Sequence, residues 1–537
     1  MSAASWLIAK AARLGPANTP EVRMEKNIPV QMPDGITLLA DRLCTPDSQP
    51  ASRPTILVRS PYGRAGFTRA MSGLPFAERG FNVIVQSCRG TGGSEGTFSL
   101  YRERDDGLAT VEWIKNQPWF DGRLGLAGPS YMTYNQWAIA AGAGPELKAL
   151  APEVGSSWLP IHDNGGFALS DALLWCLGLD LTNGAAPAWA PLMVRRRIRH
   201  AAGLFPVSGA ATFLCGPGVA AWNDIARLSS DTTSGDAHLA DHRWAVSKVS
   251  APTHFTAGWS DMFLLSLLRD YEALRAEGHQ PHLTIGPGSH LDPRTGLLGL
   301  RQAVHWMQTH LLGTADGESD GPVRLYVVGA RRWRQFPTWP PPSRSTTLWL
   351  HGNGSLITAP PQSSPARRYE YHPAAPTPAV GGRQLLPGRP RRDNRRLERR
   401  PDVLTYTSRP LAHDMEVIGP VRASISFHSS AIHTDLFVRI CDVSPLGRSV
   451  NVTDGVTAVN TATADGPVCV ELAPTAYRFR RGHRIRVQIS SGAHPWRSRN
   501  HGAGDPPLTA TRMYVAHQEV QHDTARPSII ELPVYRT

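Results

Sequence analysis

The chain of 537 residues has little cysteine, little lysine and no long apolar run. Its six cysteines are scattered and never form a Cys-x-x-Cys pair, which argues against a disulfide framework and against a cysteine-rich metal site. Its apolar runs fall short of the roughly 20 residues that a membrane-spanning helix needs. An apolar patch near the first residue has no basic start before it, unlike a secretory signal. These features predict a cytoplasmic protein with reduced thiols, without a metal and without membrane contact.

The net charge of +12 comes from arginine, since only five of the 56 basic residues are lysines. The densest run spans 391–400, within a Pro-, Arg- and Gly-rich stretch at 361–400 that predicts a loosely ordered crossing loop. This run has no interleaved aromatic residues for base stacking. We therefore interpret it as a solvated surface and expect no nucleic-acid partner; a surface for nucleic acid or acidic lipid is the alternative. A second cluster at 195–199 is interpreted as the outer face of a helix.

The most informative segment surrounds Ser130. An apolar run, 124–127, leads into Gly128-Pro129-Ser130, and a helix-compatible run follows. A strand, a sharp turn with a serine and a helix form the nucleophile elbow of an α/β-hydrolase. The usual pattern is Gly-x-Ser-x-Gly, but Met132 takes the place of the second glycine. A serine in such a turn is more often a helix N-cap, so this segment alone leaves both interpretations open.

Two later strands each end in a residue that a catalytic serine requires. Asp261 follows a predicted strand, and His290 follows another, with an amphipathic helix at 264–275 between them. An α/β-hydrolase supplies its triad in the order serine, acid, histidine. The histidine takes the serine proton, and the acid holds the imidazole in the required tautomer. Either residue alone fits a surface loop or a helix cap, but their order favours a triad with Ser130.

These segments resemble the cocaine-esterase and X-Pro dipeptidyl-peptidase group of serine hydrolases, the CocE/NonD family, over about residues 32–534. The resemblance implies that Ser130 is the nucleophile, Asp261 the acid and His290 the base. It further implies that the Tyr62 hydroxyl and the backbone N–H of Tyr131 form the oxyanion hole. The resemblance is carried by six segments in chain order: 32–41, 59–63, 89–96, 128–131, 258–261 and 286–290.

The resemblance also implies that Phe263 lines the acyl pocket. Trp158 and Trp175 are candidates for the same pocket, although each also fits the core of a helical cap. Two departures from the family pattern, Ser260 and Gly288, replace large aromatic residues and predict a widened apolar pocket. In a third departure, Thr133 stands where the family has a glycine, which bears on how tightly the helix starts.

The pattern along the chain divides it into three parts. Residues 1–153 and 248–316 alternate strand and helix signals and predict an α/β-hydrolase domain. Residues 154–247, between them, predict an inserted helical cap. From 317 to 537, short alternating strands between turns, such as 324–328, predict a C-terminal β-sandwich, which the resemblance implies is jelly-roll-like.

The predicted function is hydrolysis of a small-molecule carboxylic ester or amide through an acyl-enzyme, without a cofactor or metal. Dipeptidyl-peptidase or acylase activity is the alternative among enzymes. It requires a carboxylate that holds a free amino group, and the predicted cap offers Asp163, Asp171 and Asp180. A silent protein that binds a partner through its sandwich is an alternative of another class. The presence of all the triad and oxyanion residues argues against it, and the oligomeric state stays open.

Overall fold

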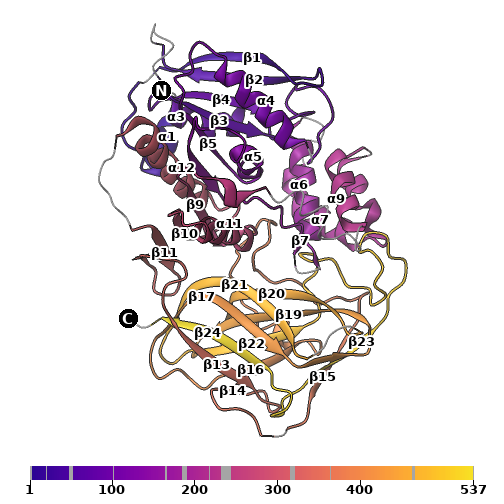
Figure 1. Cartoon of the computed structure of the whole chain (residues 1–537). Helices are drawn as coiled ribbons and strands as arrows, with labels where there is room; N and C mark the ends of the chain where they lie inside the picture. The colour runs from indigo at the N-terminus through magenta and orange to yellow at the C-terminus, as the bar shows by residue number, and fades with distance from the viewer. Residues whose placement is uncertain are drawn as a thin grey trace.

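The computed structural model describes residues 3–19, 21–46, 53–100, 102–163, 166–183, 190–216, 218–230, 244–314, 321–362, 364–462 and 466–535. A large sheet with its helices forms one end of the molecule and a β-sandwich the other (Figure 1). A group of helices, α6 to α9, lies beside the large sheet and reaches the sandwich (Figure 1).

In the described residues, ten strands form one sheet in the order β1-β2-β4-β3-β5-β6-β9-β10-β11-β12. The strands from β4 to β11 in this order run parallel, while β1, β2 and β12 pair antiparallel at the two edges. Their bounds are β1 Arg23–Gln31, β2 Thr37–Cys44, β3 Thr55–Ser60, β4 Asn82–Ser87, β5 Leu124–Pro129, β6 Leu147–Glu153, β9 His254–Ser260, β10 His282–Ser289, β11 Val323–Val327 and β12 Arg332–Phe336.

Helices cover both faces of this sheet because its central strands are apolar on both sides. In β3, for example, Leu57 packs in the cluster that includes α5 and α11, whereas Ile56 and Val58 pack in the cluster that includes α3 and α12. The helices of this domain are α1 Ala3–Ala12, α2 Gly66–Thr68, α3 Leu74–Ala77, α4 Glu103–Lys115, α5 Tyr131–Ala140, α11 Leu264–Ala276 and α12 Pro293–Met307.

The segment 323–336 belongs to this sheet and not to the sandwich in which we expected its first strand. Strand β11 pairs parallel with β10, and β12 folds back on β11 as an antiparallel edge. Short alternating strands look alike whichever sheet they join, because pairing partners are a tertiary property. The predicted boundary at 316/317 lies among residues 315–320, outside the described residues.

The insertion after β6 is helical, as its sequence indicates. It packs on helix α5, the helix that follows Ser130, through a cluster that contains Tyr131, Tyr134, Leu173 and Ile198. The opposite side meets the sandwich, where Arg499 donates to the carbonyl of Ala202 at 3.2 Å. Its elements are β7 His162–Asp163, β8 Gly166–Phe167, α6 Leu169–Thr182, α7 Ala190–Gly203, α8 Ala210–Cys215 and α9 Ala220–Ser230.

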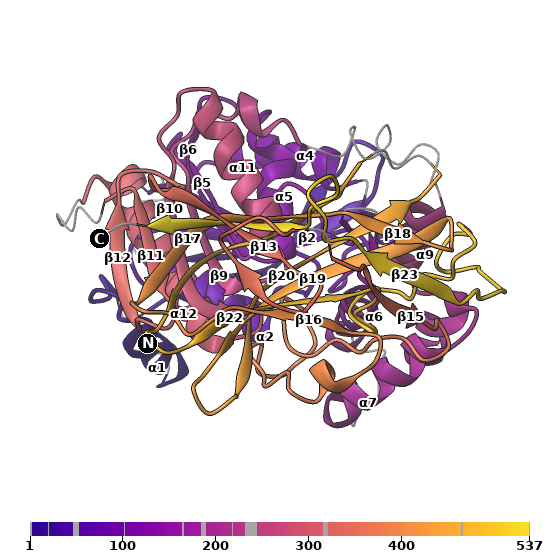
Figure 2. The same cartoon turned by 90° about the horizontal axis from the view of Figure 1, so that it is seen from below.

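The C-terminal part is built from antiparallel sheets, which Figure 2 shows from below. One sheet has the order β14-β13-β24-β17-β21, a second β16-β22-β19-β20 and a third β15-β23-β18. Their bounds are β13 Arg344–Leu350, β14 Leu356–Ile357, β15 Arg367–Tyr371, β16 Leu404–Thr407, β17 Met415–Ile425, β18 Phe427–Ser429, β19 His433–Val443, β20 Ser449–Asn460, β21 Val468–Phe479, β22 Arg484–Ser490, β23 Ala516–Val520 and β24 Ile529–Tyr535.

The arginine-rich end of the crossing loop is anchored, contrary to our expectation of a loosely ordered segment. Asn394 is fully buried, its N–H donates to the carbonyl of Ser449 at 2.7 Å, and its side chain accepts from Arg439 at 3.0 Å. The carboxylate of Glu398 turns inward and accepts from Arg486 at 2.6 Å. The sequence of a run dominated by arginine does not indicate which of its polar residues are buried and hydrogen-bonded.

Candidate active site

The elbow around Ser130 has the strained geometry that its sequence predicts. Strand β5 ends at Pro129, helix α5 begins at Tyr131, and Ser130 between them has φ 61° and ψ −127°. Positive φ is unfavourable for a residue with a side chain, so the surrounding structure must hold it. The N–H of Ser130 donates to the carbonyl of Glu153 at 2.9 Å. At Gly128, whose φ is 120°, an added Cβ would lie 2.8 Å from the Cβ of Met132.

Thr133, which departs from the family pattern, fits through a compensating glycine. Its hydroxyl can donate to either of two carbonyl oxygens, that of Gly128 at 3.0 Å or that of Glu153 at 2.9 Å. It also accepts from the N–H of Glu153 at 2.9 Å. The space for its side chain comes from Gly155, where an added Cβ would lie 2.6 Å from the Thr133 Cβ. The threonine therefore ties the elbow to the end of β6.

Ser130, His290 and Asp261 lie in one hydrogen-bonded line. The Oγ of Ser130 is 2.9 Å from Nε2 of His290, and Nδ1 of His290 is 3.2 Å from Oδ1 of Asp261. Asp261 is fully buried, and the same oxygen accepts from the N–H of Phe263 at 2.8 Å. The Phe263 ring lies 5.4 Å from the imidazole, centroid to centroid, and packs against it.

The acid and the histidine meet because β9 and β10 approach closely at their carboxyl ends. Gly258 in β9 has no side chain there: an added Cβ would lie 2.4 Å from the carbonyl oxygen of Gly288. Asp261 and His290 follow directly after these two neighbouring parallel strands. The carboxyl ends of parallel strands share one edge of the sheet, which is where an open α/β sheet places its site.

The Tyr62 hydroxyl lies at the elbow. It accepts a hydrogen bond from Nε1 of Trp175 at 3.1 Å. Burial raises the pKa of Tyr62 above its usual value, and hydrogen bonds with the Ser130 side chain, Trp175 and the Tyr131 backbone partly offset that rise. The hydroxyl therefore keeps its proton near neutral pH and lies beside both the serine and the Tyr131 N–H.

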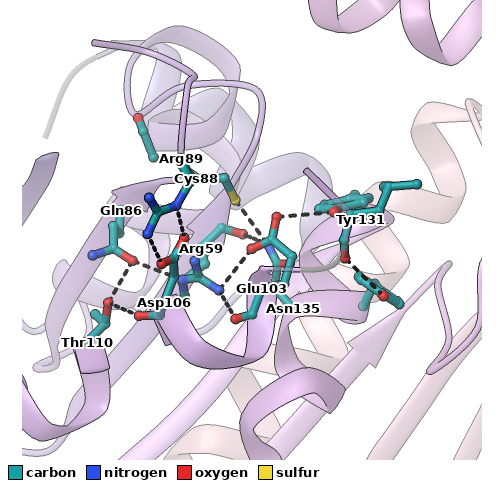
Figure 3. Close-up of polar contacts among 12 residues, drawn as sticks. Arg59, Gln86, Cys88, Arg89, Glu103, Asp106, Thr110, Tyr131 and Asn135 are labelled. Atoms are coloured by element: carbon teal, nitrogen blue, oxygen red, sulfur yellow. Dashed lines mark hydrogen bonds and ion pairs between the residues drawn. The ribbon is translucent and has the colours of Figure 1, made fainter. Parts of the chain in front are cut away.

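A buried polar network extends from the Tyr131 hydroxyl (Figure 3). The Tyr131 hydroxyl donates to Glu103 at 3.1 Å, and Glu103 pairs with Arg59 at 2.9 Å. The Arg59 guanidinium also donates to Gln86 at 2.9 Å. The backbone carbonyl of Arg59 accepts from the side chain of Asn135, in α5, at 2.9 Å. Burial raises the pKa of Glu103, and the charge on Arg59 opposes that rise. The network thus fixes the first turn of α5 against β3 and β4.

A small, mostly apolar pocket with a volume of about 40 Å³ opens at the serine. Among the residues that sequence reasoning placed there, Phe263 and Trp175 line it, and Trp158 does not, although its neighbour Leu159 does. Leu385, from the crossing loop, also lines it, and no local sequence signal pointed to that residue. The Trp175 ring stacks on Tyr131 at 5.4 Å, so this tryptophan is both pocket wall and partner of the Tyr62 hydroxyl.

The predicted widening of this pocket by Ser260 and Gly288 is wrong, since neither residue lines it. An added Cβ at Gly288 would lie 2.1 Å from the hydroxyl of Thr295, so this position faces α12. Which way a residue at the end of a strand points depends on the packed strands and helix, not on its distance in sequence from the histidine.

One of the three cap carboxylates lines the pocket. Asp171 is buried, and its Oδ1 accepts from the N–H of Leu385 at 2.8 Å. Burial raises the pKa of Asp171 to about 6. Asp180 is half-buried and does not line the pocket, and the side chain of Asp163 lies outside the described residues. Of the two candidate cap carboxylates whose side chains are described, Asp171 is therefore the one that a bound substrate can approach.

In the described part of the chain, no group of three or more His, Cys, Asp or Glu residues is arranged to hold a metal ion. No helix in the same ranges combines the length and the apolar character that crossing a membrane requires.

Two family models match the chain: X-Pro dipeptidyl-peptidase (S15 family) over residues 34–292, and the X-Pro dipeptidyl-peptidase C-terminal non-catalytic domain over 316–531. The cocaine esterase of Rhodococcus sp. (strain MB1 Bresler) is 30% identical over 582 residues, which cover 95% of this chain and 98% of the esterase.

Solved structures share the fold over nearly the whole chain. An α-amino acid ester hydrolase has a TM-score of 0.78 at 21% identity, covering 97% of this chain and 98% of the other. An aminopeptidase from the marine sediment archaeon Thaumarchaeota archaeon has a TM-score of 0.77 at 20% identity, covering 97% and 99%. At these identities, the likeness establishes the α/β-hydrolase fold with a cap and a C-terminal β domain.

Proposed function

Because the chain belongs to the cocaine-esterase and X-Pro dipeptidyl-peptidase family of serine hydrolases, we propose that it cleaves small-molecule carboxylic esters through an acyl-enzyme on Ser130. The observation that carries this proposal is the Ser130 Oγ, 2.9 Å from Nε2 of His290 in a strained elbow. A helix N-cap serine needs neither the strain nor the histidine.

The proposed reaction has two halves. The Oγ of Ser130 attacks the ester carbonyl carbon while His290 takes its proton, and the tetrahedral intermediate then expels the alcohol, which receives that proton. Water next attacks the acyl-enzyme, again giving a proton to His290, and Ser130 regains its proton as the acid leaves. Asp261 holds Nδ1 of the imidazole through both halves and stabilises the imidazolium.

The oxyanion hole in this proposal consists of the Tyr62 hydroxyl and the N–H of Tyr131. Trp175 donates to the Tyr62 oxygen, so the proton of that hydroxyl is free to point toward the developing oxyanion. The network from Glu103 to Arg59 holds the helix turn that carries the Tyr131 N–H. Donors fixed in advance stabilise the transition state without reorganising during the reaction.

The proposed substrate has a small or medium apolar acyl group. Leu159, Ile161, Ala172 and Phe263 supply an apolar wall, and few polar groups converge on the pocket. An apolar pocket discriminates by roughly 1–3 kcal/mol per methylene, so preference should be graded. We expect branched or phenyl-bearing acyl esters to outrun acetyl esters, and Xaa-Pro amides to be poor substrates.

Hydrolysis of substrates with a free α-amino group is the second candidate function, because the Asp171 carboxylate lines the pocket. An ammonium group beside Asp171 would favour its ionised form, which burial now disfavours. The N–H of Leu385 already binds one carboxylate oxygen, so an amine would have to share this carboxylate with the crossing loop.

Labelling by a fluorophosphonate probe, followed by a substrate panel, tests these candidates. The wild type should be labelled, and Ser130→Ala should not be. The panel compares acyl esters of increasing size, α-amino acyl esters and Xaa-Pro amides. A strong preference for Xaa-Pro amides would refute the esterase proposal. A preference for α-amino acyl esters that Asp171→Asn removes by raising KM would favour the second candidate.

The setting of this activity completes the proposal. All six cysteines have free thiols, which suits a reducing compartment such as the cytoplasm. We propose that residues 154–247 act as the cap through which substrate enters, and that the strands after 337 form a jelly-roll-like sandwich whose crossing loop completes the pocket through Leu385.

A further inference from the structure

A second, larger cavity lies where the crossing loop faces cap helix α7. It has a volume of about 760 Å³, and eight of its ten lining residues are arginines; the others are Gly388 and Asp393. One wall is helix α7 with Arg195, and the other is the loop from 388 to 399. The two walls come close together at Gly388, where an added Cβ would lie 3.7 Å from the Arg195 guanidinium.

Most of this positive charge has no acidic partner in the described part of the chain. Arg395 pairs with Asp393 at 2.7 Å, and Arg391 donates to the Tyr477 hydroxyl at 3.0 Å and lies over its ring. No ion pair joins an acid of the described ranges to the remaining six arginines of the cavity: Arg195, Arg389, Arg392, Arg396, Arg399 and Arg448.

The mutual repulsion of these cations affects the pKa of Arg195. Burial lowers the pKa of Arg195, and repulsion from Arg199 and Arg392 lowers it further. The backbone of the loop is nevertheless held in place by hydrogen bonds to inward-facing groups. The N–H of Arg392 donates to Asn451 at 2.8 Å, and the N–H of Gly382 donates to the carbonyl of Pro390 at 2.7 Å. Except for Arg391, the lining arginines are exposed, and guanidinium groups gathered on facing walls add their positive potentials at a bound ligand.

The geometry points to a binding site for a small polyanion, one that carries several phosphate groups. Guanidinium groups bind phosphate oxygens through paired hydrogen bonds, and two facing walls of arginine suit a ligand with charges along its length. A nucleic acid is disfavoured because aromatic residues for base stacking are missing from the described lining of this site.

The polyanion site adjoins the catalytic pocket. A neighbouring cavity shares Arg195, Arg389 and Arg392 with it and extends to Ser289, the residue before His290. Leu385 lines the catalytic pocket, while its chain neighbours, Gln384 and Leu386, line this connecting cavity. The polyphosphate group therefore belongs either to a free anion or to the substrate itself; the latter source rests on the proposed function.

Calorimetric titration with inorganic tripolyphosphate at low and at physiological salt tests the site. The variant Arg195→Ser/Arg392→Ser removes one arginine from each wall. Hydrogen bonds to charged groups are worth enough that each lost arginine should weaken binding about tenfold. The control, Arg104→Ser/Arg344→Ser, removes two exposed arginines that line neither cavity and should bind like the wild type. Thermal melting verifies that all proteins are folded.

Either of two results with tripolyphosphate would overturn the site: no binding by the wild type at low salt, or equal binding by the two variants. Tighter binding of a short single-stranded DNA than of tripolyphosphate, lost in the wall variant, would overturn it in favour of a nucleic-acid surface. Kinetics with a neutral ester and with an ester of a phosphorylated alcohol then identify the source. If the wall variant Arg195→Ser/Arg392→Ser has a higher KM than the wild type for the phosphorylated ester alone, the phosphate belongs to the substrate. If this variant loses tripolyphosphate binding but keeps the wild-type KM for both esters, the phosphate belongs to a free anion. The binding measurement needs no hydrolysis, so it stands apart from the proposed function.

Discussion

The pair formed by Tyr62 and Trp175 offers the sharpest test of the proposed oxyanion hole. Tyr62→Phe removes one of two donors while leaving the ring in place. Loss of a single oxyanion donor costs roughly 10²–10³ in kcat, or about 3–4 kcal/mol. KM should change little, because the donor acts on the oxyanion more than on the ground-state carbonyl.

Trp175→Phe should have a smaller effect that depends on Tyr62. The substitution keeps an aromatic ring against Tyr131 but removes the Nε1–H, 3.1 Å from the Tyr62 hydroxyl. A neutral hydrogen bond contributes roughly 0.5–1.5 kcal/mol, so kcat should fall about threefold to tenfold. In the Tyr62→Phe background the N–H has no hydroxyl to orient, and Trp175→Phe should then change kcat by less than about threefold.

Steady-state kinetics on one activated aryl ester across the four proteins of this cycle measures the coupling. Tyr134→Phe is the matched control, because Tyr134 packs in the same cluster but its hydroxyl points to the carbonyl of Leu100 at 3.4 Å. That control should keep its kcat. Independent effects of the two substitutions would refute the orienting role of Trp175. A raised KM with unchanged kcat in Tyr62→Phe would reassign Tyr62 to substrate binding.

Three further outcomes are expected. Ser130→Ala should abolish aryl ester hydrolysis without lowering the melting temperature; retention of a tenth of the turnover would exclude Ser130 as nucleophile. Gly258→Ala should remove most of the activity, because its Cβ would lie 2.4 Å from the Gly288 carbonyl oxygen and push β9 away from β10. The control Gly296→Ala, which has open space around it, should be tolerated. Equal activity of the two variants would contradict the close approach of β9 and β10. Burial raises the pKa of Glu153 to about 8 from its usual 4.5, so the folded state holds this proton more tightly and stability falls as pH rises through that window. Glu153→Gln should remove this part of the decline, and melting curves of both proteins with parallel pH dependence from pH 5 to 9 would argue against it.

The meeting of the three proposed catalytic groups at one edge of the sheet could be predicted from the sequence because parallel strands impose it. Ser130, Asp261 and His290 each follow an apolar strand, and parallel strands bring their carboxyl ends to one edge wherever they lie in the chain. The Gly128-Pro129 turn before Ser130 likewise predicts the sharp turn between strand and helix from the local sequence alone. For these residues local pattern and tertiary position agree, so pattern was sufficient.

Other features depend on contacts between segments that no local pattern relates. The N–H of Trp175 meets a hydroxyl 113 residues earlier in the chain. Strand β11 joins the hydrolase sheet because β10 offers it an edge, although its alternation suits a sandwich equally. Gly288 faces Thr295 and not the pocket because α12 packs there.

The arginine run shows the division most clearly. Its composition determined that a strong positive charge would lie on an exposed segment, because guanidinium groups are too costly to bury without partners. Only the tertiary structure decided that this charge would form the wall of a cavity. Buried Asn394 and Glu398 hold the loop rigid from within, and helix α7 brings Arg195 to its other side. Charge is a property of residues, whereas concavity arises from the packing of distant segments.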